Sequence, residues 1–237
     1  MKYPSIPKNE SERLAALHRY LILDTHEEEA FDQIVWLVSH ICKTPVAYIS
    51  IIDKDRQWFK SKIGIEAAQT PRDISFCAHA ILEKHVLLVP DAMTDDRFED
   101  NPLVLSDPRI RFYAGVPLLS KEGLALGTLC AVDHLPRTLS EDQLQALNAL
   151  SRQVEALLEL RRSNIELKEA IAEVKILSGL LPVCAWCKRV RDEEGNWRTI
   201  EVYLNSHSEA SLTHGICPDC TEKFHEKNAG SGASSKV

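Results

Sequence analysis

The chain has 237 residues, of which 44% are hydrophobic, and a formal net charge of −7. This length fits one large or two modest domains with a sizeable core, and the negative charge argues against a nucleic-acid surface. No apolar run is long enough to cross a bilayer, and the polar N-terminus carries no signal-peptide pattern, so we expect a cytoplasmic protein. Four of the seven cysteines lie in two CxxC pairs and three are isolated, which fits a reducing compartment.

Helices and strands are predicted throughout the first two thirds of the chain. Residues 8–20 predict a helix, and Thr25 with Glu28 predicts a capping box that starts a second helix ending near Cys42. Ser75 or Asp73 is expected to cap a short helix over residues 76–83. The predicted strands span residues 46–52, 57–63, 86–91, 111–119 and 124–132, with a loop at 67–75 and another from 95 to about 109. This order indicates an α+β fold, an antiparallel sheet with helices on one face and long loops on the other.

Four motifs in this region resemble the GAF domain family, most closely its branch in bacterial sensor kinases and diguanylate cyclases. They are SFCAHAI at 75–81, DDRFEDNPLV at 95–104, IRFYAGVPL at 110–118 and LGTLCAVD at 126–133. The resemblance covers about residues 10–158. It implies a six-stranded antiparallel sheet, dimerisation through flanking helices, and a ligand cavity beneath the crossover loop and helix.

The segments that the resemblance assigns to the cavity carry mixed polar and aromatic side chains, as a ligand site requires. Arginine forks there would suit an anion or a nucleotide. The alternative is structural, because Arg97 and Arg111 can pair with Asp91, Asp95 or Asp100 and simply hold the loops in place. The candidate ligand residues are Phe76, Cys77, His79, Asp91, Arg97, Phe98, Asn101, Arg111 and Tyr113.

Cys77 and Cys130 raise the question of catalysis. Relatives that reduce free methionine sulfoxide use cysteines lining this cavity, which leaves a thiol-based enzyme as an alternative. Buried cysteine more often serves as a small apolar residue, and the Cys77-Ala-His79 arrangement does not suit bilin attachment. We therefore assign no catalytic residue, and expect no enzymatic activity and no kinase, cyclase or phosphodiesterase domain.

A long helix is predicted from about Ser140 to Leu181, with Ser140 and Gln143 as a capping box. From Leu157 its apolar residues follow a heptad with Asn164 at one a position, which favours a parallel two-stranded coiled coil. An exposed amphipathic helix that packs on its own domain is the alternative. We expect a homodimer through residues 157–181. The a positions are Leu157, Asn164, Ile171 and Ser178, and the d positions are Leu160, Leu167, Val174 and Leu181.

The C-terminal region carries the most specific chemistry, the pairs Cys184/Cys187 and Cys217/Cys220. Two CxxC turns supply the four thiolates of a tetrahedral site, and a module this small needs a metal in place of a large core. We expect structural Zn²⁺, with a rubredoxin-like iron centre and a redox pair as alternatives, and His214 as a further possible ligand. The run 180–220 resembles a cysteine-rich tail of some bacterial two-component proteins, and a hairpin over 189–200 and a helix over 200–206 are predicted within it.

The sequence therefore predicts a signalling protein of the two-component type. We expect a GAF-like sensor at residues 1–158, a coiled-coil helix at 159–181, a zinc-ribbon-like module at 182–227 and a disordered tail at 228–237. The sensor would bind a small molecule or detect redox state, and the dimeric helix would relay this to the zinc module and a protein partner. A purely structural dimeric adaptor is the remaining alternative.

Overall fold

The computed structural model describes residues 2–178, 181–192, 194–207, 213 and 215–222. It contains two compact units, Met1–Leu167 and Lys168–Val237. Within the described ranges, no helix is long and apolar enough to span a membrane. The predicted disordered tail at 228–237 and His214 lie outside the described residues.

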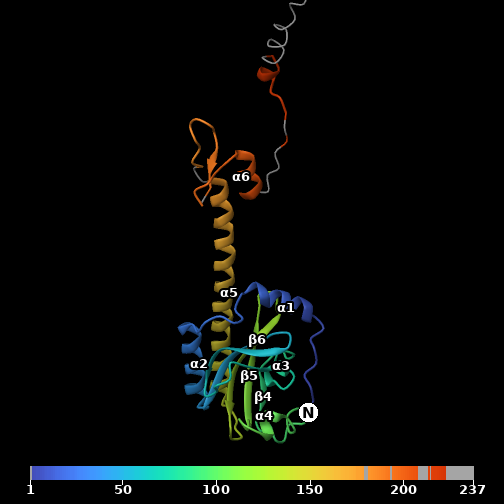
Figure 1. Cartoon of the computed structure of the whole chain (residues 1–237). Coiled ribbons are helices and arrows are strands. Elements are labelled where there is room, and N and C mark those ends of the chain that lie inside the picture. The colour runs from blue at the N-terminus through green and yellow to red at the C-terminus, as the bar shows by residue number, and fades with distance from the viewer. Residues whose placement is uncertain (1, 179–180, 193, 208–212, 214, 223–237) are drawn as a thin grey trace, which may run out of the picture. The chain divides into compact units, whose positions relative to one another are not determined.

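Unit 1 is built on a six-stranded antiparallel sheet with the strand order β3-β2-β1-β6-β5-β4 (Figure 1). Strands β1 and β6 form the centre, where long runs of buried side chains pair in register from Val46↔Val132 to Ile51↔Gly127. The strands are β1 (Val46–Ile52), β2 (Arg56–Ile63), β3 (Gln69–Pro71), β4 (Leu87–Val89), β5 (Phe112–Leu119) and β6 (Ala125–Asp133).

Helices cover the sheet on both faces, and not on one face alone as predicted, and each face has its own core. Side chains alternate along a strand, so Leu129 and Ala131 of β6 face one core, whereas Cys130 and Val132 face the other. The first core packs against α1 (Glu10–Arg19), α2 (Glu29–Cys42) and α5 (Glu141–Ser178). The second packs against two short helices, α3 (Phe76–Ala80) and α4 (Pro102–Leu105), and the loops around them.

The predicted start of the long helix is confirmed by its hydrogen bonds. The Gln143 amide N–H donates to Ser140 Oγ at 3.2 Å, and the Ser140 N–H donates to Gln143 Oε1 at 2.9 Å, which is a reciprocal capping box. Ser75 is likewise the N-cap of α3, because its Oγ accepts from the Ala78 N–H at 3.1 Å.

Three further details of the sequence prediction are wrong. Thr25 does not cap α2: its hydroxyl donates to the Ile22 carbonyl at 2.7 Å, and the helix begins at Glu29. The stretch 67–75, expected to be a loop, contains β3, an edge strand whose largely exposed residues and Pro71 carry no strand pattern. The loop before Arg109 contains the single turn of α4, with Pro102 at its start.

The N-terminal helix is fixed to the sheet by a buried arginine. The Arg13 side chain is 1% exposed and donates to the Ile52 carbonyl at 2.7 Å. The Glu10 carboxylate forms salt bridges with Arg13 Nε at 2.8 Å and with Arg72 Nη1 at 2.5 Å. One carboxylate therefore joins α1 to the segment that leads into α3.

Helix α5 packs on unit 1 over its first part and then presents apolar side chains to solvent. Leu147, Val154 and Leu158 are buried in the first core. Further along, Leu160, Leu167 and Ile171 are 59%, 57% and 46% exposed. The side chains of 173–178 lie outside the described residues.

Unit 2 contains the predicted hairpin, formed by β7 (Val190–Arg191) and β8 (Trp197–Arg198), followed by α6 (Ile200–His207). Gly195 has φ +88° in the turn between the strands, a conformation that side-chain-bearing residues rarely adopt.

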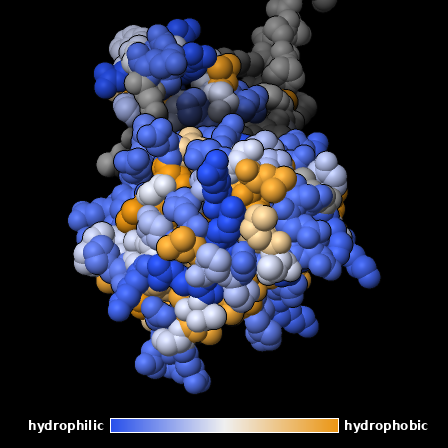
Figure 2. All heavy atoms as spheres, turned by 90° about the horizontal axis from the view of Figure 1, so that it is seen from below, coloured by the Kyte–Doolittle hydropathy of each residue, from blue (hydrophilic) through white to orange (hydrophobic). Residues whose placement is uncertain are grey.

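The face of the protein in Figure 2 is mostly hydrophilic, and its apolar patches are small and separate. That face offers no large apolar docking surface.

Candidate functional site

The candidate site lies on the second face of the sheet, where α3 and the loops on either side of α4 cover strands β1, β5 and β6. The structure brings the predicted ligand residues together there, but most of them fill the interior. Five of the nine are at most 2% exposed: Phe76, Cys77, Phe98, Asn101 and Tyr113. A ligand would have to part these side chains to enter.

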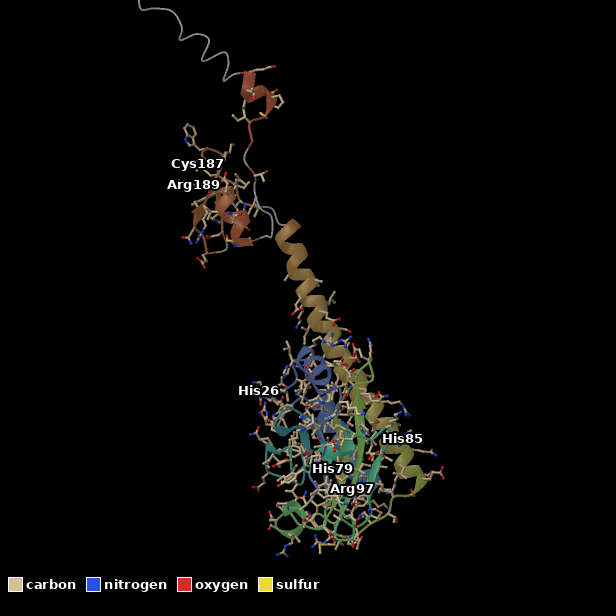
Figure 3. The ribbon with its side chains drawn as sticks, turned by 90° about the vertical axis from the view of Figure 1, so that its right-hand side faces the viewer. His26, His79, His85, Arg97, Cys187 and Arg189 are labelled. Atoms are coloured by element: carbon tan, nitrogen blue, oxygen red, sulfur yellow. The ribbon has the colours of Figure 1, made fainter. Side chains whose placement is uncertain are left out.

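The aromatic side chains form a stack beneath the crossover loop. Phe76 and Phe98 lie parallel with their ring centroids 4.0 Å apart, and Tyr113 lies 5.2 Å from Phe76. His79 closes the outer side, with its ring edge-on to Phe98 at 4.9 Å. His79 and Arg97 lie close together in Figure 3. Burial first, and then the positive charge of Arg97, lower the pKa of His79, which favours its neutral form.

The polar residues of the predicted pocket hold the covering loops in place. Arg97 pairs with Asp95 at 2.6 Å, as the structural alternative anticipated, and this hydrogen bond lowers the pKa of Asp95. Arg111 donates to the carbonyls of Val104 at 2.9 Å and of Ile110, rather than to a carboxylate.

Two further predicted residues also bind backbone groups. Asn101 accepts from the Leu103 N–H at 2.9 Å, which caps α4, and donates to the Ile74 carbonyl at 2.9 Å. Asp91 accepts the Met93 N–H at 3.0 Å. These contacts order the loops without any ligand.

A groove of about 980 Å³ lies elsewhere, between α2 and β2, and none of the nine residues lines it.

Beneath the aromatic stack, two thiols face each other. Cys77 Sγ on α3 lies 3.6 Å from Cys130 Sγ on β6, and both residues are fully buried. The Tyr113 hydroxyl lies 3.3 Å from each sulfur. Burial raises the pKa of Cys77, but hydrogen bonds, that from Cys130 first, outweigh it and lower the pKa to about 6. Burial and the neighbouring Cys77 raise the pKa of Cys130 well above its ordinary value.

A glycine makes room for this arrangement. Gly115 on β5 pairs directly with Cys130, and a Cβ built on Gly115 would lie 2.1 Å from the Tyr113 hydroxyl oxygen. The phenol ring therefore lies over the glycine, which places its hydroxyl at the same distance from the two sulfurs. A larger residue at 115 would move the hydroxyl away.

Three polar members of the thiol cluster were not predicted from the sequence. Thr128 Oγ1 lies 3.0 Å from Cys130 Sγ and 2.9 Å from Ser50 Oγ, and the Tyr48 hydroxyl lies 3.8 Å from Cys77 Sγ. The sequence pattern that could have revealed them is a polar side chain at alternate positions of an otherwise apolar strand. Such side chains stand at positions 48 and 50 of β1 and at position 128 of β6. Same-face positions along two paired strands predict one cluster.

The two CxxC pairs form separate turns in unit 2. The Cys187 N–H points to Cys184 Sγ at 3.5 Å, and backbone hydrogen bonds from Cys187 and then Trp186 lower the pKa of Cys184. Cys217 has a pKa lowered by the backbone N–H of Cys220, the Cys220 side chain and other groups. Thiolate-stabilising turns of this kind suit a soft metal ion.

The structure does not bring the two turns together. Cys187 is exposed at the surface (Figure 3), as are Cys217 and Cys220. In the part of the chain that the structure describes, no three histidine, cysteine, aspartate or glutamate side chains are grouped closely enough to hold a metal ion. The Zn²⁺ site and its iron alternative stay predictions.

Comparison with known proteins gives one family and one close sequence relative. The model of the GAF domain matches residues 26–158. The chain is 45% identical over 164 residues to a cyclic di-GMP phosphodiesterase of Pseudomonas aeruginosa, covering 69% of this chain and 28% of that protein. The chain thus spans about a quarter of the length of this relative. Our expectation of no enzymatic activity is corrected by this finding, because the shared segment occurs in a protein named as an enzyme.

Solved structures with a similar fold have low sequence identity. The GAF domain of an Acinetobacter phosphoenolpyruvate-protein phosphotransferase is 17% identical with a TM-score of 0.48, over 65% of this chain and 98% of that one. A free methionine-R-sulfoxide reductase of Neisseria meningitidis is 15% identical with a TM-score of 0.48, over 69% and 98%. Similarities of this strength carry nothing about activity.

Proposed function

This chain belongs to the GAF domain family, and on that premise we propose that it is a dimeric sensor in cyclic di-GMP signalling. Unit 1 receives a signal at the site beneath α3, as a small molecule that parts the aromatic stack or as a change in redox state. The 45% identity over 164 residues with a cyclic di-GMP phosphodiesterase supports the signalling context. The segment shared with that enzyme would serve to regulate cyclic di-GMP turnover.

Helix α5 carries the proposal, because it follows β6, which is a strand of the signal site, and because it bears an exposed apolar stripe. Strand β6 holds Cys130 on the site face, and its next residue, Ala131, on the face that contacts the core of α5. Past that core, Leu160, Leu167 and Ile171 follow the heptad spacing and are about half exposed or more. Asn164 lies exposed between them. A second copy of the helix would bury this stripe and pair the asparagines.

We propose that the two CxxC turns bind one Zn²⁺ through Cys184, Cys187, Cys217 and Cys220, in cytoplasmic conditions that keep thiols reduced. The lowered pKa values of Cys184 and Cys217 support thiolate ligands. Bound zinc would supply the stability that a unit of this size lacks. The unit it orders would contact a protein partner.

The test is the oligomeric state of the full chain, measured by sedimentation equilibrium. We expect a dimer for the wild type and a monomer for Leu167→Asp, because the charge would be buried at the seam. Ala172→Asp is the matched control: it lies on the same exposed part of α5 but off the stripe, and should remain dimeric. Asn164→Leu should change the number of chains that associate or their affinity. A wild-type monomer, or no effect from both seam variants, would disprove the dimeric helix.

A further inference from the structure

The buried thiols have the arrangement of a reversible disulfide rather than of inert core cysteines. They come from residues 53 positions apart in the chain, yet their sulfurs lie 3.6 Å from each other. A disulfide bond needs about 2.05 Å between sulfurs. Helix α3 packs directly on β6, so side-chain rotation and a small shift of this five-residue helix could close the gap.

We propose that Cys77 and Cys130 are an oxidation site, at which a hydroperoxide converts the dithiol of unit 1 into a disulfide. The polar surroundings favour this chemistry over simple packing. Tyr113 places a hydroxyl 3.3 Å from both sulfurs, and Thr128 places another 3.0 Å from Cys130. A hydrogen-bond donor stabilises a thiolate far more than a neutral thiol.

The two cysteines have different roles in the reaction. The Cys77 thiolate attacks one peroxide oxygen, the O–O bond breaks, and the leaving oxygen takes the thiol proton and departs as an alcohol or water. Cys77 is then a sulfenic acid. The Cys130 sulfur attacks the Cys77 sulfur, the S–O bond breaks, and water leaves with the Cys130 proton. Two thiols are oxidised and one hydroperoxide is reduced. The lowered pKa of Cys77 fits the thiol that attacks the peroxide, and the raised pKa of Cys130 fits the thiol that then reacts with the sulfenic acid.

The inference deepens the proposed function by giving its redox signal a chemical form, and rests on that function only for the relay. The disulfide would tie the covering helix α3 to β6, a central strand of the sheet. Leu129 and Ala131, the neighbours of Cys130, face the core that holds α5. Oxidation would therefore act on the strand that leads into the long helix.

Cys42 provides an internal control within the same chain. It is almost as deeply buried, at 1% exposure, but it lies on the other face of the sheet, in the core of α2. Burial raises the pKa of its thiol to about 11. Because its thiolate is scarce at neutral pH, a peroxide that merely reaches buried thiols through unfolding would oxidise Cys42 and the pair together.

The experiment exposes the full-length, reduced chain to hydrogen peroxide at pH 7, quenches samples with an alkylating agent, and maps non-reduced peptides by mass spectrometry. We expect a Cys77–Cys130 cross-linked peptide, lighter than the two thiol peptides by two hydrogen atoms and reversed by dithiothreitol. It should form at least about tenfold faster than Cys42 is oxidised. Equal rates, or a pair that stays alkylated as thiols after Cys42 has reacted, would overturn the inference.

Two variants test the assigned roles. Cys130→Ser should stop the reaction at a Cys77 sulfenic acid that dimedone traps. Tyr113→Phe should raise the pH midpoint of Cys77 oxidation. Should either variant not fold, the wild-type peptide map still decides. If the chain is a dimer but Cys77 and Cys130 form no disulfide, this inference alone is refuted. If the Cys77–Cys130 disulfide forms but the chain is a monomer, the dimeric relay alone is refuted.

Discussion

Glu10→Gln removes the carboxylate that neutralises two arginine side chains at the junction of α1 and the sheet. Burial alone would raise the pKa of Glu10, but its hydrogen bonds to Arg13 and Arg72 and their charges lower it from 4.5 to about 2. Without any screening, that shift in pKa would contribute at most about 3 kcal/mol to the free energy of unfolding at neutral pH. The Glu10 side chain is 16% exposed, and solvent screening reduces the expected loss of unfolding free energy to about 1–2 kcal/mol.

The sign of the pH dependence follows from the direction of the shift. Since the folded state holds the pKa below the unfolded value of 4.5, the carboxylate stabilises the fold above that pH. The contribution is lost as pH falls toward 2. The difference between wild type and Glu10→Gln should therefore be full at pH 7 and less than half as large by about pH 3.

Urea unfolding followed by tryptophan fluorescence measures this difference. Trp58 of unit 1 is 7% exposed, whereas Trp36, Trp186 and Trp197 are 51%, 95% and 46% exposed. The emission change on unfolding thus reports mainly on unit 1. Glu12→Gln, an exposed residue on the same helix, is the matched control and should change little. A destabilisation by Glu10→Gln that is the same at both pH values would refute the ionic origin of the effect.

Three further outcomes follow from the structure. Gly115→Ala should displace the Tyr113 hydroxyl and cost about 1–3 kcal/mol in thermal unfolding, and should slow Cys77 oxidation; unchanged oxidation would show that the hydroxyl is not needed. Ser75→Ala should cost about 1–2 kcal/mol, because it leaves the Ala78 N–H without its cap; a loss below about 0.3 kcal/mol would contradict that cap. Elemental analysis should find about one zinc per chain, and a chelator should abolish the circular dichroism of unit 2 but not of unit 1; iron with thiolate absorption would replace the zinc assignment.

The sequence predicted elements whose signals are local. Strand β1 (Val46–Ile52) was predicted at its observed bounds, because every residue in it except Ser50 is apolar, aromatic or β-branched, and all seven are buried. The Ser140–Gln143 box was likewise visible, because a cap depends on residues three apart. The six-stranded sheet came from the family resemblance, since the exposed residues of β3 (Gln69–Pro71) give no periodicity.

The chemistry of the site depended on contacts that no local pattern contains. Cys77 and Cys130 could be named as candidates, but their proximity depends on how α3 lies across β6. The role of Gly115 was also hidden, because the side chain that needs its space belongs to Tyr113 of the same strand. The arginines were predicted in both a ligand-binding and a structural role. The structure gives Arg97 the second, through its contact with Asp95.

Helix α5 has a consequence for how such proteins can be rearranged. It runs without glycine or proline from Glu141 to Ser178, and each residue of an α-helix turns the chain by about 100°. Removing seven residues from its exposed part would keep the angular phase of whatever follows to within about 20°. Removing five would rotate it by about 140°, to another face. Natural or engineered fusions that exchange the segment after this helix should therefore accept length changes in steps of seven and lose regulation at intermediate lengths.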